Sequence, residues 1–313
     1  DLINAFKNNS YLHVIDEGTK LFSQNNTIPV FANLVGASYA SINDHVNAIN
    51  FYKKALEIDT NNFEILNNLG KSQIELLLYS DALNTFNKSL DINPNNYDTY
   101  FNLGIIFFEK ENYEDALDYY LKAIELNNKF DKLFYNVGIL KTKVGRNKEA
   151  INYFEKTLEI NNLNTKALNN LSNIYINENK YDVAKHYLEK AIKIDPKYAK
   201  AYNNLGTVYL QKKEYQTALD NFTIAFKLDK SLIISGVQKH FLKRLFCDWS
   251  ENDELKFILE KSIIDENEVS PWFCLAIDDN SKNHFLRASN FSKKFKTVRT
   301  NNNIYQNKKI KIG

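Results

Sequence analysis

The feature that most constrains this chain is a stretch of 34 residues that recurs six times in succession without an insertion. One copy, Tyr97–Phe130, reads YDTYFNLGIIFFEKENYEDALDYYLKAIELNNKF. The six copies occupy residues 29–62, 63–96, 97–130, 131–164, 165–198 and 199–232. A copy of this length cannot bury its own apolar residues, so neighbouring copies are expected to stack and to share a continuous core.

Sliding the frame by one copy aligns small residues in three columns and aromatic residues in a fourth. The eighth position reads Gly36, Gly70, Gly104, Gly138, Ser172 and Gly206. The twentieth reads Ala48, Ala82, Ala116, Ala150, Ala184 and Ala218, and the twenty-seventh Ala55, Ser89, Ala123, Thr157, Ala191 and Ala225. The twenty-fourth reads Tyr52, Phe86, Tyr120, Phe154, Leu188 and Phe222. Small residues let two helix backbones approach closely, and aromatic rings fill the space between helices.

The order of these columns resembles the tetratricopeptide repeat, a helix–turn–helix unit with a period of 34 residues. The resemblance implies an all-α fold, a right-handed superhelical solenoid of about six full repeats over residues 29–232. It also implies a groove along the inner surface, which is where a partner would bind.

The segments on either side of the repeats are expected to be helical. Residues 1–28 are interpreted as a degenerate N-terminal repeat or cap, with helical spacing between Tyr11 and Leu21. Residues 233–299 are interpreted as a helical cap and connector. Its helices are expected over 234–246, up to Ile264 after a capping box at Ser250 and Asp253, and from Asn280 or Ser281 to about Lys294.

Composition excludes several classes of function. The net charge of +2 does not favour binding to nucleic acid or to acidic membranes, and no apolar run is long enough to span a bilayer. The first residues do not resemble a signal peptide.

Cys247 and Cys274 have no metal-binding or disulfide spacing and are expected to be reduced, partly buried thiols of a cytoplasmic protein. The chain lacks Met and begins at Asp1, so it is interpreted as a piece of a longer protein.

A narrower resemblance covers the region after the repeats. Residues 245–259, LFCDWSENDELKFIL, resemble the segment that follows the repeats in protein O-glycosyltransferases of the O-GlcNAc transferase/SPINDLY type. Pro271, Trp272, Phe273 and Leu275 resemble the next segment of that family, and 285–295 its following helix. Residues 300–313 then resemble a linker and the first strand of a catalytic domain. The resemblance implies a parent enzyme that uses a nucleotide-sugar donor.

No catalytic or metal-binding constellation is visible in the sequence. The five histidines are scattered and form no pair at metal-ligand spacing: His13, His45, His186, His240 and His284. Cys247, Asp248 and Trp249 are interpreted as a structural corner with a buried Trp. We therefore expect no catalytic residue, metal or cofactor in this stretch, and no enzymatic activity of its own.

The informative column is the sixth position, which we call the asparagine column. After Leu34 in the first copy, it reads Asn68, Asn102, Asn136, Asn170 and Asn204. In tetratricopeptide geometry this position faces the groove, and an Asn amide can pair with both the N–H and the C=O of a peptide unit. The O-GlcNAc transferase repeats resemble this pattern, which implies binding of the substrate backbone. The alternative is drift in an Asn-rich chain.

The second position forms a charge column that changes from acidic to basic. After Val30 it reads Glu64, Asp98, Lys132, Lys166 and Lys200. It is either a polarised groove or a row of solvated helix starts without a partner. A carboxylate clamp of the chaperone-adaptor kind would need an Arg in the groove, and the sixth position offers none.

The leading hypothesis is therefore a protein–protein interaction arm that binds extended polypeptide segments for a protein O-glycosyltransferase. The alternative is a stand-alone scaffold or adaptor with no enzymatic activity. The sequence does not specify the sugar, the target proteins or the oligomeric state.

Overall fold

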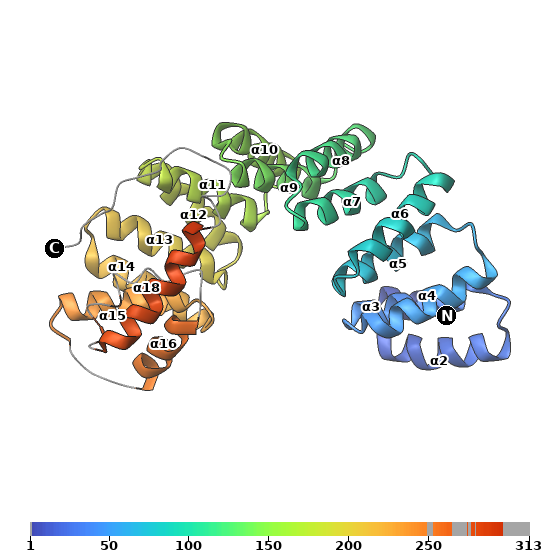
Figure 1. Cartoon of the computed structure of the whole chain (residues 1–313), viewed down its shortest axis with the longest axis horizontal. Helices are drawn as coiled ribbons and strands as arrows, with labels where there is room; N and C mark the ends of the chain where they lie inside the picture. Colours follow the sequence, from blue (N-terminus) through green and yellow to red (C-terminus); the bar gives the residue numbers. More distant parts are fainter. Residues whose placement is uncertain (1, 249–252, 265–273, 275–276, 279, 297–313) are drawn as a thin grey trace. The chain divides into compact units, whose positions relative to one another are not determined.

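The computed structural model describes residues 2–248, 253–264, 274, 277–278 and 280–296, and they form helices joined by turns, with no strand among them (Figure 1). The helices are α1 (Leu2–Lys7), α2 (Tyr11–Gln24), α3 (Pro29–Ser41), α4 (His45–Ile58), α5 (Phe63–Glu75), α6 (Tyr79–Ile92), α7 (Tyr97–Glu109), α8 (Tyr113–Leu126), α9 (Asp131–Lys143), α10 (Asn147–Ile160), α11 (Thr165–Asn177), α12 (Tyr181–Ile194), α13 (Ala199–Gln211), α14 (Tyr215–Leu228), α15 (Ile233–Leu245), α16 (Asp253–Ile264) and α18 (Ser281–Lys296). The predicted all-α fold is confirmed.

Each of the six repeats forms two helices, as predicted. The first helix has 13 residues and the second has 14 in every copy, for example α7 and α8 in 97–130. The two helices of a copy pack against each other, and some first helices of neighbouring copies also touch, as α3 does with α5 and α11 with α13. Side-chain caps explain several of the starts, because Asn62, Asn96 and Asn164 accept hydrogen bonds from backbone N–H groups of the following turn.

The register of the repeats extends beyond the six copies. The turn between the two helices of a copy contains one residue with a positive φ angle, and this residue recurs every 34 residues at Asn9, Asn43, Leu77, Glu111, Gly145, Asn179, Lys213 and Cys247. The turn at Asn9 lies between α1 and α2, and Cys247 directly follows α15. Residues 1–28 and α15 therefore keep the repeat geometry, although their side chains depart from the columns.

The chain divides into two compact units, which are described separately. Unit 1 is Asp1–Ile160 and contains α1–α10, whereas unit 2 is Asn161–Gly313 and contains the remaining helices. The boundary falls after the second helix of the copy 131–164.

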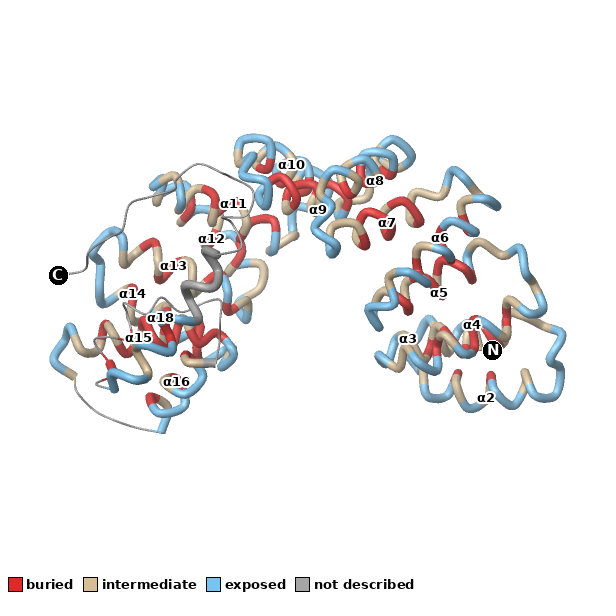
Figure 2. The backbone as a smooth tube through the Cα atoms, in the orientation of Figure 1, coloured by how far each residue is buried: buried red, intermediate tan, exposed pale blue. Residues whose placement is uncertain are grey.

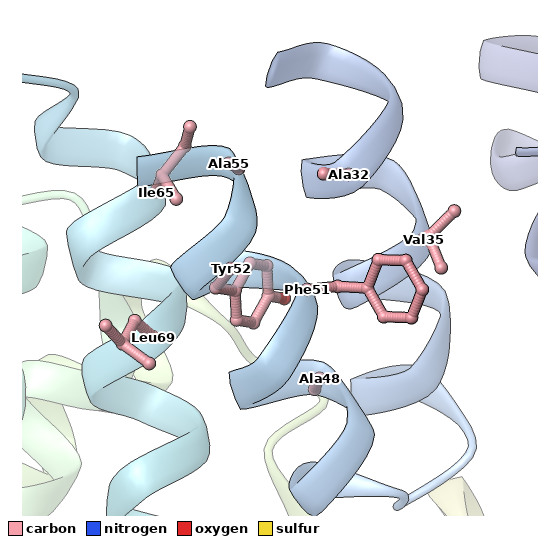
Figure 3. Close-up of a cluster of buried hydrophobic side chains, with 8 residues drawn as sticks. All are labelled: Ala32, Val35, Ala48, Phe51, Tyr52, Ala55, Ile65 and Leu69. Atoms are coloured by element: carbon pink, nitrogen blue, oxygen red, sulfur yellow. The ribbon is translucent and has the colours of Figure 1, made fainter. Parts of the chain in front are cut away.

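The small columns are buried where successive helices pack. Figure 2 shows the buried residues along one side of the helices, and the alanines of the twentieth position are completely buried from Ala48 to Ala218. Figure 3 shows the first such cluster, in which residues of α3, α4 and α5 meet. Its members are Ala32, Val35, Ala48, Phe51, Tyr52, Ala55, Ile65 and Leu69.

The glycine column exists because an aromatic ring occupies the place of its missing side chain. A Cβ atom added at Gly104 would lie 2.5 Å from the ring of Tyr120, and one at Gly138 would lie 2.6 Å from Phe154. Gly36, Gly70 and Gly206 face Tyr52, Phe86 and Phe222 in the same way. The one copy with Ser172 instead of Gly also has Leu188 instead of the aromatic residue, and both are fully buried. The two departures in the sequence therefore occupy one packing site.

We expect Gly104→Ser to cost about 1–3 kcal/mol of stability, because its Cβ would overlap the Tyr120 ring. Adding Tyr120→Leu recreates the natural pair of 165–198 and should recover most of the loss. The measurement is a double-mutant cycle of unfolding free energies in urea. Simple additivity of the two single losses would contradict this account of the column.

The region after the repeats follows the predicted helices closely where it is described. Helix α15 spans nearly the expected residues, α16 ends at Ile264 as expected, and α18 starts at Ser281 and ends two residues beyond the predicted Lys294. Trp249, Ser250, the 271–273 segment, Leu275 and the 300–313 linker and strand lie outside the described residues. None of the helices in the described part of the chain is both long and apolar enough to cross a membrane.

Candidate peptide-binding surface

The asparagine column lies on the first helices of the repeats, but its members differ in exposure. Asn68 and Asn136 of unit 1 and Asn170 and Asn204 of unit 2 are half-buried. Asn102 is only 5% exposed, and its Nδ2 donates to the Asp98 carbonyl at 2.7 Å. We expected all five amides to face the groove alike. This expectation is wrong for Asn102, whose amide is buried and donates to the backbone of its own helix.

The other amides of unit 1 also contact neighbouring side chains. The Nδ2 of Asn68 lies 3.4 Å from Asn33 Oδ1 of the preceding first helix, and the Nδ2 of Asn136 lies 3.4 Å from the Tyr120 hydroxyl oxygen. Both distances are long for a hydrogen bond, so these contacts are weak. Burial raises the pKa of Tyr120, which keeps its hydroxyl neutral at any physiological pH.

In unit 2, Asn204 is held more tightly by its neighbours. Asn204 Nδ2 donates to Asn169 Oδ1 at 2.8 Å, and Asn204 Oδ1 accepts from Asn203 Nδ2 at 3.1 Å. Asn203 Oδ1 in turn accepts from the Ser235 hydroxyl at 2.8 Å. These four residues, which we call the asparagine relay, connect α11, α13 and α15.

The fifth position, directly before the asparagine column, is a second set of polar residues that sequence reasoning missed. Four copies carry Asn here, namely Asn33, Asn67, Asn169 and Asn203. Asn67 is buried and accepts from Thr99 at 2.6 Å and from Ser89 at 3.2 Å. The available signal was the repeated Asn–Asn pair in 67–68, 169–170 and 203–204. In the two middle copies this position is aromatic, and Phe101 and Tyr135 pack on rings instead.

The sixth position continues into α15 as Gln238, one period after Asn204. Gln238 is 7% exposed, and its Oε1 is buried without a hydrogen-bond partner in the described part of the chain. Sequence analysis missed it because the other columns are lost after Leu232. An amide therefore also occupies the sixth position in the first helix after the six copies.

The charge column is only partly available to a ligand. Glu64 and Lys132 of unit 1 and Lys166 and Lys200 of unit 2 are exposed. Asp98 instead forms an ion pair with Lys71 of the preceding first helix, so it is not a free acidic group. The predicted acidic side of the column is thus reduced to Glu64 within unit 1.

An apolar pocket lies where the asparagine column ends at Leu34. Its volume is about 420 Å³, and it opens among α1, α2 and α3 of unit 1. The lining residues are Leu2, Ile3, His13, Glu17, Leu21, Val30, Phe31 and Leu34. The replacement of amide and charge by Leu34 and Val30 in the first copy thus coincides with this apolar surface.

The histidine, cysteine and acidic side chains of the described residues are the candidates for a metal site. No cluster of three or more His, Cys, Asp or Glu side chains with metal-binding geometry occurs among them. Cys274 is buried as a thiol, whereas Cys247 is exposed, so the prediction of partial burial was wrong for Cys247. Burial raises the pKa of the Cys274 thiol, which disfavours the reactive thiolate.

Sequence-family models match four parts of the chain. Models of the tetratricopeptide repeat match residues 36–76, 97–130 and 131–162. The model of the tetratricopeptide repeat protein 21 C-terminal ARM domain matches residues 158–235. The predicted tetratricopeptide repeats are thereby confirmed. A search of curated proteins finds no match to the chain.

Solved structures with a similar fold include two that cover most of this chain. The structure of the APC/C hetero-tetramer Cut9-Hcn1 has a TM-score of 0.65 and 17% identity, and the match covers 77% of this chain and 48% of that chain. The chain thus spans about half the length of that relative. PilF of Pseudomonas aeruginosa has a TM-score of 0.58 and 16% identity over 77% of this chain and 99% of its own. YrrB, described as a TPR protein with an unusual peptide-binding site, reaches a TM-score of 0.48 at 24% identity, covering 59% of this chain and 95% of its own.

Proposed function

We propose that this tetratricopeptide-repeat chain is a protein–protein interaction module that binds extended polypeptide segments through the asparagine column. The observation that carries the proposal is the half-buried amide that recurs at the sixth position of the first helix in four of the six copies. In unit 1 these amides belong to Asn68 and Asn136, and in unit 2 to Asn170 and Asn204.

The spacing of packed helices suits an extended ligand. Neighbouring helix axes in proteins lie about 8–10 Å apart, and an extended chain advances about 3.3–3.6 Å per residue, so one amide would meet about every third peptide unit. An amide offers a donor and an acceptor together, which matches the backbone and not the side chain of a ligand. The ligand must be unstructured, because the backbone groups of a helix are already paired.

The test is a fourfold variant in which Asn68, Asn136, Asn170 and Asn204 become Ala. Each hydrogen bond contributes about 0.5–1.5 kcal/mol net, so loss of the two bonds that one unit offers should weaken binding of a peptide to that unit by about 5- to 150-fold. Binding is measured by fluorescence anisotropy with the strongest labelled binder from an array of short random-sequence peptides. Asn102 is left in place because it is buried.

A matched control replaces four exposed asparagines of second helices with Ala. These are Asn50, Asn84, Asn87 and Asn152. The control removes the same number of amides from a different surface and should leave peptide affinity unchanged. Equal affinity of both fourfold variants for the peptide would overturn the proposed function.

We further propose that the module is the substrate-binding arm of a nucleotide-sugar-dependent protein O-glycosyltransferase of the O-GlcNAc transferase/SPINDLY type. Support comes from the resemblance of residues 245–259 to the segment after the repeats in that family, together with the asparagine column. The sugar donor would be bound by catalytic lobes outside residues 1–313, and this stretch would not catalyse transfer.

The alternative is a scaffold or adaptor without an attached enzyme. The two are separated by the coding sequence that follows Gly313, because the enzyme requires nucleotide-sugar-binding lobes there. A stop codon at that point would support the scaffold and sink the glycosyltransferase proposal. Incubation of the purified chain with a labelled nucleotide sugar should give no transfer and no donor hydrolysis.

A further inference from the structure

The asparagine relay of unit 2 is a directed chain of hydrogen bonds across three first helices. The Ser235 hydroxyl of α15 donates to Asn203 Oδ1 at 2.8 Å, and Asn203 Nδ2 donates to Asn204 Oδ1 at 3.1 Å. Asn204 Nδ2 then donates to Asn169 Oδ1 of α11 at 2.8 Å. All three hydrogen bonds thus run in the same donor-to-acceptor direction, from Ser235 to Asn169. In such a chain each hydrogen bond polarises and strengthens the next.

The two ends of the asparagine relay are firmly placed. Ser235 is completely buried, and Asn169 is 5% exposed. Asn203 and Asn204 between them are half-buried, so the middle of the relay reaches the surface. The buried ends therefore hold an accessible amide in one orientation.

The Asn204 amide has hydrogen-bonding capacity beyond its bonds to Asn169 and Asn203. An Asn side chain has two N–H donors and an oxygen that accepts two hydrogen bonds. Asn169 takes one donor, and Asn203 fills one acceptor site. Within the described part of the chain, one N–H and one oxygen lone pair remain, which is the pair that a peptide unit requires.

We infer that Ser235 and Asn203 are positioning residues that preset the Asn204 amide for the backbone of a bound extended polypeptide. The inference rests on the proposed function and names the residues that orient one member of the asparagine column, Asn204. A preset amide loses little side-chain freedom when it binds, so more of its hydrogen-bond energy appears as affinity. Asn136 in unit 1, with one weak contact to Tyr120, lacks this support.

The first experiment tests the asparagine relay without any ligand. In the whole chain labelled with ¹⁵N-Asn, the side-chain N–H of Asn204 that donates to Asn169 should exchange slowly with water, and the Asn204 amide should report a single conformer. Ser235→Ala should speed this exchange, and Ser235→Thr, which keeps the hydroxyl, should restore it. Fast exchange of the Asn204 amide in the wild-type chain would overturn the inference whether or not a peptide binds.

The second experiment measures affinity for the peptide selected from the random-sequence array. Ser235→Ala should weaken binding about three- to tenfold, the effect of one net hydrogen bond, and Ser235→Thr should bind like the wild type. In an Asn204→Ala background, Ser235→Ala should have no further effect. Retention of the full Ser235→Ala loss in that background would show that Ser235 acts elsewhere, and the inference would fail.

Thr99→Ala is the matched control for a loss of packing alone. Thr99 occupies the same third position as Ser235 and donates to a fifth-position Asn, Asn67, at 2.6 Å. Among the described residues, Asn67 makes no hydrogen bond to the asparagine column, and Asn68 contacts Asn33 instead. Thr99→Ala should therefore destabilise unit 1 without changing peptide affinity. A wild-type chain that binds no peptide would refute the proposed function itself, whereas normal peptide affinity of Ser235→Ala would refute only the positioning role.

Discussion

Replacing Arg287 with Ala should destabilise the docking of α18 on α16 by about 3–5 kcal/mol, the cost of leaving one buried charge without its partner. Arg287 is 2% exposed, and its Nε donates to Ser262 Oγ at 2.9 Å and its Nη2 to the Leu259 carbonyl at 3.1 Å. Its Nη1 lies 2.6 Å from Asp278 Oδ2. One guanidinium thus connects α18 to α16 and to the segment before α18.

Asp278 depends on this partner because it is itself buried. Burial opposes its ionisation, but hydrogen bonds from the Asn280 backbone, Arg287 and Asn283 outweigh this effect and hold the pKa of Asp278 below its usual value. Without Arg287 the buried carboxylate would remain charged with only the hydrogen bonds from Asn280 and Asn283, or it would take up a proton. Either outcome costs free energy.

The measurement is hydrogen exchange of the α18 backbone amides, since local opening reports the stability of this helix separately from that of the repeats. Arg287→Ala should raise the hydrogen-exchange rates of the backbone amides across residues 281–296. The double variant Arg287→Met with Asp278→Leu removes both charges and should lose far less than the single variant. Equal losses in the two variants would mean that the ion pair does not hold α18.

Acidification should weaken the contact between α15 and α16 through Glu254. The Glu254 carboxylate accepts from Lys239 of α15 and from Lys230 at 2.9 Å, and His240 Nε2 lies 3.4 Å away. Burial opposes its ionisation, but the hydrogen bonds and charges of Lys239 and Lys230 prevail and lower the pKa of Glu254 to about 2. A Glu side chain in an unfolded chain has a pKa of about 4.3, so Glu254 binds a proton less readily in the folded state than in the unfolded state.

Glu254 therefore stabilises the folded state by at most about 3 kcal/mol at neutral pH. This contribution is fully present above about pH 5 and is lost as the pH falls from there through about 2. His240 acts in the same direction at higher pH. Burial and the neighbouring Lys239 lower the pKa of His240, so the folded state loses stability as the pH falls below about 6.5, the value of an unfolded His.

Glu254→Gln is the variant that isolates the carboxylate. The variant should be less stable than the wild type at neutral pH. The two stability curves should converge near pH 2, where the wild-type carboxylate takes up a proton and becomes neutral like the Gln amide. Hydrogen exchange of α16 amides across this range measures the difference. A constant gap between the curves at every pH would show that Glu254 acts through packing and not through charge.

The helices of the repeats could be predicted closely because their signals are local. Small and aromatic residues at a period of 34 predict two helices per copy, and the last residue of three copies, Asn62, Asn96 or Asn164, caps the first helix of the next copy. The substitution of Ser172 was visible in the sequence, as was that of Leu188, but only the packing of Gly104 against Tyr120 explains why they occur together. The recurrence of one residue type at a position shows that the position is constrained, but it does not identify the side chain that packs against it.

The candidate surface was predicted only in outline. The period correctly placed the asparagine column on the first helices, yet equivalent residues differ in what they do: Asn102 bonds its own helix, and Asn204 bonds two other asparagines. Asp98 was expected to be a free charge and is paired with Lys71. These differences arise from neighbouring helices, which the period of one copy does not describe.

By itself, therefore, the sequence determined the repeat, its helices, its register and the faces that are buried, because helical periodicity and residue size act within one copy. Only the tertiary structure decided which polar side chains meet across helices, as in the asparagine relay and around Arg287. The physical reason is one of scale. A hydrogen bond requires a donor–acceptor distance of about 3 Å, so small shifts between neighbouring helices choose the partner of each polar group.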